Sequence, residues 1–216
     1  MKVLNLYAGI GGNRKLWPCE NVTAVEFNPQ IAAVYRKFFP KDTVIVGDAH
    51  EYLKNHCSEY DFIWASPPCQ SHSSFRQNIC VRYRGTKPEY PDMRLYQEIL
   101  FLRHNYNGFF VIENVKPYYT PLVKPDCILQ RHLFWSNVTI SEKIFRKDVI
   151  RRAQIPQLQE QHGFDLTGIS VKNKRQVLRN CVYPEVGLHI WGCMVAQKNN
   201  MECDLKTANN TQSMPA

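Results

Sequence analysis

Two segments of the sequence carry side chains that could do covalent or acid–base chemistry. In 65–70 (ASPPCQ), two prolines stiffen the backbone just before Cys69. A thiol held this way could be a nucleophile where its thiolate is favoured, although an isolated cysteine is more often a small buried hydrophobe. In 111–115 (VIENV), Glu113 leaves an apolar run, where burial would raise the pKa of its carboxyl and suit it to donate a proton. The two segments predict a nucleophile with an acid–base partner.

A third segment, 8–12 (AGIGG), offers backbone amides to a nucleotide-like ligand. It lacks the third glycine of a dinucleotide-binding turn, because Arg14 stands in that place. Glu26 and Asp48 each follow a predicted strand, where one carboxylate suits ribose hydroxyls and the other an exocyclic adenine amine. The turn and the two carboxylates together predict an adenosine site.

The elements that must position these residues alternate between β-rich runs and helical periodicity. Strands are predicted at 2–7, 22–27, 43–46, 62–65, 109–112 and, running antiparallel, 133–135. Helices are predicted at 29–39, directly after 47–48, at 93–103 and at 184–195. Strands that alternate with helices indicate βαβ units, so the fold class is α/β with a parallel sheet. The chemistry-bearing segments follow strands and should meet at the carboxyl edge of that sheet.

Composition narrows the class of protein. The chain has 216 residues, 44% of them hydrophobic, which suits a single domain with a sizeable core. Its net charge of +8 suits a folded protein with a polyanionic partner. No apolar run approaches the ~18 residues of a membrane span, and positions 1–20 lack a signal peptide. Eight cysteines without a CxxC pair indicate reduced thiols, so we expect an intracellular protein.

Three blocks of the sequence together resemble the DNA (cytosine-5) methyltransferases. The blocks 5–12 (NLYAGIGG), 67–70 (PPCQ) and 113–115 (ENV) match the first, fourth and sixth motifs of that family, in order. Supporting blocks are 25–27, 47–48, 92–96, 131–135 and 179–184. The resemblance covers about residues 1–137 and 174–195, on a compact plan similar to the small methyltransferases of bacteriophages.

The resemblance implies a Rossmann-like, S-adenosylmethionine-dependent methyltransferase fold, a mostly parallel twisted sheet with helices on both faces. It divides the chain into a discontinuous catalytic domain (1–137 and 175–197), a very small target-recognition segment (138–174) and a flexible tail (198–216).

The implied reaction is methyl transfer from S-adenosylmethionine to C5 of cytosine in DNA. Cys69 would attack C6 of a cytosine flipped out of the duplex, and Glu113 would hydrogen-bond or protonate N3. The implied cofactor-binding residues are Tyr7, Ala8, Gly9, Ile10, Gly11, Glu26, Phe27, Asp48, Leu95, Asn180 and Cys181. The implied substrate-binding residues are Pro68, Asn114, Val115 and His132.

Several positions depart from the family pattern. Asn5 and Tyr7 replace the usual Asp and Phe of the first block, and His72 replaces a Phe after the nucleophile. Gln130 and His132 stand where the eighth block has an arginine pair, and the arginine-rich ninth block is not recognisable. The altered eighth and missing ninth blocks keep open a non-catalytic or partner-dependent nucleic-acid-binding protein on a degenerate methyltransferase fold.

A tRNA cytosine-5 methyltransferase is a second alternative, although Gln70 after the nucleophile favours DNA. The expected partner is double-stranded DNA, with no membrane, no metal and a monomer favoured. Cys181, His189 and Cys193 match no zinc spacing, so helix packing is expected there. The expected location is the cytoplasm or nucleoid of a bacterial phage host, or the nucleus in a eukaryote.

The segment 138–174 has about 37 residues, which predicts a short target of roughly two to four base pairs or dependence on a partner. The candidate base-reading side chains are Arg151, Arg152, Gln154, Gln157, Gln159 and Gln161. The candidate phosphate-binding cluster is Lys143, Arg146, Lys147, Arg151 and Arg152.

Overall fold

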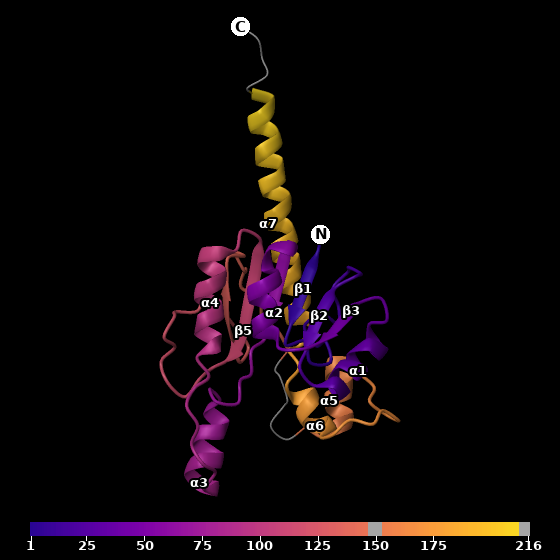
Figure 1. Cartoon of the computed structure of the whole chain (residues 1–216), viewed down its shortest axis with the longest axis vertical. Coiled ribbons are helices and arrows are strands. Elements are labelled where there is room, and N and C mark those ends of the chain that lie inside the picture. The colour runs from indigo at the N-terminus through magenta and orange to yellow at the C-terminus, as the bar shows by residue number, and fades with distance from the viewer. Residues whose placement is uncertain (147–152, 212–216) are drawn as a thin grey trace.

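A seven-stranded sheet in the order β3-β2-β1-β4-β5-β7-β6 runs through the molecule, which is a computed structural model describing residues 1–146 and 153–211 (Figure 1). The parallel strands are β1 (Val3–Leu6), β2 (Thr23–Glu26), β3 (Thr43–Val46), β4 (Phe62–Ala65) and β5 (Phe109–Val115). β7 (His132–Ser136) pairs antiparallel with both β5 and β6 (Cys127–Leu129). The order and the single reversed strand confirm the Rossmann-like methyltransferase fold.

Helices cover both faces of this sheet because the strand side chains alternate between two cores. Leu4 and Leu6 of β1 belong to one hydrophobic cluster, whose helical members include Leu53 and Ile99. Val3 belongs to another cluster on the opposite face. The first face is covered by α2 (Ala49–His56) and α4 (Arg94–Asn105), and the second by α7 (Pro184–Thr211). Figure 1 shows α2 and α4 in front of the strands and α7 passing behind them.

A third cluster joins α1 (Pro29–Phe38) to the segment after β7. Leu158 of α5 (Ile155–His162) and Leu178 of α6 (Lys174–Arg179) are fully buried there, beside Tyr35 of α1. The 138–174 segment therefore shares a hydrophobic core with α1 and β2, through its described residues.

The expected elements are present, with changes at some ends. β5 continues three residues beyond Ile112, because Glu113 and Asn114 pair with β7. Four further elements were not expected from the sequence besides α5 and α6: β6, the short turns η1 (Cys57–Glu59) and α3 (Arg82–Arg84), and the π-helical turn η2 (Arg76–Val81). Isolated turns of this length carry too little periodicity to be recognised.

The tail expected at 198–216 is helical through Thr211, because α7 continues well past Val195. No Gly or Pro lies between Gly192 and Pro215, and Lys198 forms an i,i+4 ion pair with Glu202. Figure 1 shows the last part of α7 extending beyond the rest of the protein. Within the described ranges, no helix is long and apolar enough to cross a membrane.

Arg14, which stands in the place of a third glycine, anchors the turn after β1. Its guanidinium donates to Asp42 Oδ2 at 3.1 Å and to the Trp17 and Cys19 carbonyls, and the Asp42 side chain is only 1% exposed. Asp42 also accepts hydrogen bonds from the Tyr35 hydroxyl and the Val22 amide. This buried ion pair fixes the start of β3 against the turn.

We expect Asp42→Ala to lower the free energy of unfolding by about 3 kcal/mol, because it leaves the Arg14 charge buried without its counterion. The neighbouring Lys41→Ala is the matched control, since Lys41 pairs with Glu20 on the exposed surface and should cost about 1 kcal/mol or less. Urea denaturation followed by tryptophan fluorescence measures both variants. Equal losses would show that the buried pair does not anchor the turn.

Candidate active site

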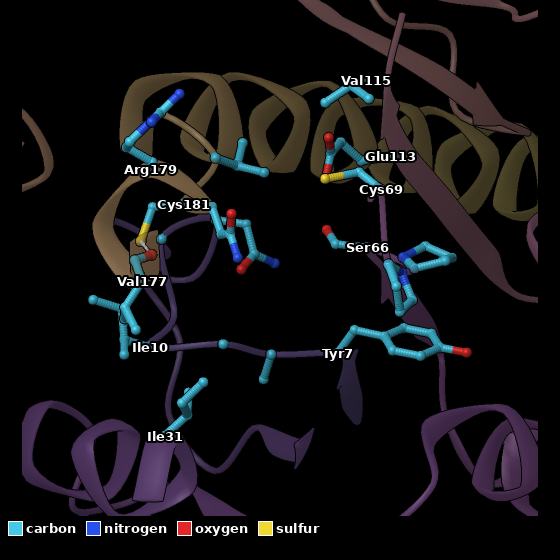
Figure 2. A pocket seen from close by; sticks show the side chains of 18 of the residues that line it. Tyr7, Ile10, Ile31, Ser66, Cys69, Glu113, Val115, Val177, Arg179 and Cys181 are labelled. Carbon is cyan, nitrogen blue, oxygen red and sulfur yellow. Dashed lines mark hydrogen bonds between the residues drawn. The ribbon is translucent and has the colours of Figure 1, made fainter. Parts of the chain in front are cut away.

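The carboxyl ends of the parallel strands, together with the start of β7 and the end of α6, line a cavity of about 320 Å³ (Figure 2). Most of the predicted site residues lie on its wall: Tyr7, Ala8, Gly9, Ile10, Glu26, Phe27, Pro68, Cys69, Glu113, Val115, His132, Asn180 and Cys181. Residues from six separate stretches of the chain therefore meet. Four of these stretches lie together because parallel strands end at the same sheet edge.

The turn after β1 forms one side of the cavity. Its backbone passes through the left-handed region at Tyr7, Gly9 and Gly11, with φ of 54°, 56° and 88°. The Gly9 amide donates to Glu26 Oε2 at 2.9 Å, which ties the turn to the end of β2. A Cβ at Gly11 would lie 2.3 Å from the Phe39 ring, so this glycine allows close packing rather than lining the cavity.

Asn5, which replaces the usual Asp of the family, has a hydrogen-bonding partner inside the protein. Asn5 is fully buried, and its side-chain oxygen accepts a 2.8 Å hydrogen bond from the side chain of Asn13, which lines the cavity. An amide can donate and accept within such a pair, whereas a buried carboxylate would carry a charge. The pair holds the far end of the turn.

The two prolines place Cys69 as expected, and β5 fixes the segment from the other side. The Asn114 side chain donates to the Pro67 carbonyl at 3.0 Å, and Trp64 donates to the Ser66 hydroxyl at 2.9 Å. The Cys69 carbonyl accepts hydrogen bonds from the amides of residues 72 and 73. The thiol is thus held at a defined position at the end of β4.

Cys69 and Glu113 lie side by side in the cavity (Figure 2). Burial raises the pKa of the Glu113 carboxyl to about 7, against opposing effects of a Ser66 hydrogen bond and the Arg131 charge. Burial also raises the pKa of the Cys69 thiol to about 11, and the Glu113 charge adds to the rise. Arg131 opposes it. The expected rise in the pKa of Glu113 is confirmed, whereas Cys69 is a protonated thiol at neutral pH.

In the altered eighth block, Arg131 lies between Gln130 and His132, the two positions where the family has arginines. Gln130 has a φ of 52° and donates to the Arg146 carbonyl, while Arg131 lines the cavity and donates to the Arg179 carbonyl at 3.2 Å. His132 Nε2 lies 3.5 Å from Glu113 Oε1, and burial lowers the pKa of this histidine well below its usual value. The left-handed turn at Gln130 thus brings a cation and a neutral imidazole to the side of the cavity that holds Cys69 and Glu113.

Four predicted residues do not line the cavity. Asp48 caps α2, where its carboxylate accepts the amides of residues 50 and 51. Leu95 is buried in the core between α4 and the sheet, and Gly11 packs against Phe39. The Asn114 side chain lies outside the cavity lining and donates a hydrogen bond to the Pro67 carbonyl.

His72, which stands where the family has a Phe after the nucleophile, is 1% exposed. Its Nδ1 lies 2.5 Å from the Tyr119 hydroxyl, and burial lowers the pKa of the imidazole. The loop turns inward at this residue because His72 packs against aromatic rings of α4 and the 118–119 segment.

Further lining residues were not singled out from the sequence: Gly12, Asn13, Ile31, Ser66, Pro67, Gln70, Val177, Arg179, Val182 and, above all, Arg131. Arg131 lies within a block that was recognised, but only the neighbouring positions carried an expectation. Within residues 1–146 and 153–204, no group of three or more His, Cys, Asp or Glu side chains could hold a metal ion.

A sequence profile described as C-5 cytosine-specific DNA methylase matches residues 1–122 of the chain. Among solved structures, DNMT2 of Spodoptera frugiperda is 27% identical over 53% of this chain and 35% of its own, with a TM-score of 0.35. A SAM-dependent methyltransferase from Agrobacterium tumefaciens is 17% identical over 56% of this chain and 40% of its own, with a TM-score of 0.39. At such scores the fold assignment rests on the sheet order. No curated protein sequence matches the chain.

We expect Glu113→Gln to change how stability depends on pH. Because the pKa of Glu113 is about 7 in the folded protein and 4.5 in an ordinary environment, the folded state binds this proton more tightly. Stability from this group is therefore present below pH 4.5 and lost as the pH rises to 7, a loss of about 3 kcal/mol. Urea titrations of wild type and variant between pH 4.5 and 7.5 should show a difference that grows in favour of the variant. Glu160→Gln, an exposed control on α5, should show none, and a constant difference for Glu113→Gln would contradict the buried carboxyl.

We expect the reaction of Cys69 with iodoacetamide to accelerate steadily from pH 7 to pH 10, because only the thiolate reacts and the thiol pKa is about 11. Arg131→Gln should slow the reaction at every pH in this range, because the arginine charge lowers that pKa. Peptide mass spectrometry measures labelling at Cys69 alone. Lys37→Gln removes an exposed charge from α1 as a control, and equal rates in the two variants would exclude the effect of Arg131.

Proposed function

Since the chain belongs to the C-5 cytosine-specific DNA methylase family, we propose that it methylates C5 of cytosine in double-stranded DNA through a covalent adduct on Cys69. It is a methyltransferase whose cofactor is S-adenosylmethionine, as membership of this family implies. The observation that carries the proposal is that the half-buried Cys69 thiol and the buried Glu113 carboxyl lie side by side on one cavity wall (Figure 2).

The glycine-turn side of the cavity fits S-adenosylmethionine. The Glu26 carboxylate accepts the amides of Gly9 and Asn28, and its oxygens keep lone pairs for ribose hydroxyls. The Phe27 ring lines the cavity yet is 75% exposed, so it offers an aromatic face that an adenine would cover. No described atom lies within 4 Å of where a Cβ of Gly9 would be, which leaves room for the ligand. Asn180 and Cys181 also line the cavity, and Cys181 lies against Gly12 of the same turn.

When bound, S-adenosylmethionine supplies a methyl group on a positively charged sulfur. Cys69 loses its proton to solvent, and its sulfur forms a bond to C6 of cytosine. The electrons of the C5–C6 double bond move to C5 and toward N3. C5 then takes the methyl group, and loss of the C5 proton to water restores the double bond and expels the Cys69 thiolate. Arg131 favours the thiolate both before the bond to C6 forms and when the thiolate is expelled, because its charge lowers the pKa of the thiol.

Glu113 stabilises the charge that develops on the ring. With a pKa of about 7, a large share of the carboxyl is protonated at neutral pH and can donate to N3. His132, with its lowered pKa, lies against the same carboxyl as a neutral group. Pro68 and Val115 shape the pocket, and Asn114 holds it through the Pro67 carbonyl.

The depth of the site supports base flipping. Glu113 is only 6% exposed, so a cytosine stacked in a duplex cannot bring N3 to its carboxyl. Enzymes that act on a base turn it out of the stack into such a pocket. The net charge of +8 favours binding of the protein to the negatively charged phosphates of the nucleic acid backbone on either side of the flipped base.

We expect Cys69→Ser to abolish methyl transfer while S-adenosylmethionine binding stays near the wild-type value, because other residues hold the cofactor. Glu113→Gln should lower turnover by roughly 10²-fold, the scale for removing a positioned acid. Bisulfite sequencing of DNA methylated by purified protein measures both, with Cys127→Ser on β6 as the control.

Duplex DNA containing 5-fluorocytosine should form a stable adduct at Cys69, since the C5 proton that release requires is absent. A Cys69→Ser protein that methylates at a comparable rate would refute the nucleophile. Methylation of tRNA and not of DNA would move the assignment to the RNA-modifying alternative, and neither activity would favour the non-catalytic one.

A further inference from the structure

We propose that the helical segment 74–87, rather than 138–174, reads the DNA sequence around the target cytosine. This inference rests on the proposed function and names the element that gives it specificity.

The segment expected to read bases is committed to the body of the protein. Leu158, Phe164 and Leu166 are 0–1% exposed in the core shared with α1. The side chains of Gln154 and Gln157 form the capping box of α5, and Gln159 accepts the Leu166 amide at 2.9 Å. These candidate readers are therefore occupied by their own backbone. Arg151 and Arg152, like Lys147 of the basic cluster, lie outside the described residues.

A different element projects from the edge that carries the cavity. Figure 1 shows η2 and α3 as one helical arm extending away from the sheet, on the side opposite the free end of α7. Every residue from 82 to 90 is exposed, and the Tyr83 side chain is 81% exposed. We call residues 74–87 the arm.

The arm carries the charge and the side chains that a DNA groove selects. It contains Arg76, Arg82, Arg84 and Lys87, and the sequence has no Asp or Glu between Asp61 and Glu89. Arginine pairs with guanine edges, glutamine and asparagine pair with adenine edges, and an aromatic ring can wedge between base steps. Gln77, Asn78 and Tyr83 add these to the arginines. The major groove is wide enough for a helix.

The root of the arm is fixed to the catalytic segment. The amides of residues 72 and 73 donate to the Cys69 carbonyl, and the Gln77 amide continues the chain of hydrogen bonds to the Ser73 carbonyl. The Ser74 hydroxyl donates to the Lys116 carbonyl, and Ser73 forms a bridge with Pro117. The start of the arm is therefore tied to the segment that carries the nucleophile, which places the arm beside the base pairs that neighbour the target cytosine.

The start of the arm makes two further contacts outside it, and its far end is closed by its own backbone. The Arg179 guanidinium lies 5.9 Å from the Phe75 ring, and Arg76 pairs with Glu89 at 2.6 Å. Gly85, at φ 65°, ends the helix, and the Thr86 amide closes it on the Cys80 carbonyl. Arg82, Tyr83 and Arg84 at the exposed tip are thus presented on a supported helix.

The test compares two triple variants that lose equal charge from the two segments. The arm variant combines Arg82→Gln, Tyr83→Ala and Arg84→Gln, and the segment variant combines Lys143→Gln, Gln161→Ala and Lys172→Gln. Each purified protein methylates a random-sequence duplex library, which is read by deep bisulfite sequencing. We expect the arm variant to lose about tenfold discrimination at one or more positions flanking the cytosine, the scale of one bidentate base contact. It should still form the Cys69 adduct with 5-fluorocytosine DNA, and the segment variant should keep the wild-type preference. An unchanged preference in the arm variant, or a flattened one in the segment variant, would overturn the inference.

Hydrogen–deuterium exchange of the wild-type chain with a duplex oligonucleotide is a second test, and it does not depend on methylation. Amides of residues 74–87 should gain protection, and those of 154–174 should not. Protection of 74–87 in a chain that methylates nothing would count against the proposed function while supporting the inference. Protection confined to 154–174, or none in either segment, would overturn the inference whatever the activity.

Discussion

The proposed chemistry depends on one constraint, the half-buried Cys69 thiol and the buried Glu113 carboxyl side by side in one cavity. Burial raises the pKa of Glu113 to about 7 and that of Cys69 to about 11, and an ionised Glu113 raises the thiol pKa further. The proton on Glu113 and the thiolate on Cys69 therefore favour one another, because a neutral carboxyl removes the charge that opposes the thiolate. Arg131 lowers both pKa values. Hydrogen-bonded links between segments hold these two groups in place.

Buried polar pairs provide that rigidity where the chain leaves regular structure. The Asn114 amide ties the end of β5 to the proline segment, and the Asn5–Asn13 pair ties the glycine turn to β1. Both pairs satisfy hydrogen bonds that burial would otherwise leave unmade. A site assembled from strand ends needs such links, since the strands fix where each loop begins but not where it goes.

The compact size of the chain shapes its recognition surface. The apolar side chains of the segment after β7 pack in a core with α1, and the side chains of three of its glutamines form hydrogen bonds within the segment. A small domain gains stability from such burial, because much of its surface is otherwise exposed. The exposed, basic arm then remains next to the catalytic segment. Core packing and DNA reading are thus divided between the two segments under our proposal.

The sequence by itself determined the order of the five parallel strands and of helices α1, α2 and α4, the antiparallel strand near Trp135, and the raised pKa of Glu113. These follow from local periodicity and from an acid placed in an apolar run. Only the tertiary structure decided that Arg131 faces the cavity and that His72 is buried. The cavity wall and the ring that packs against His72 come from residues far apart in sequence. Burial is set by what packs against a residue, and that information is not present in its own segment.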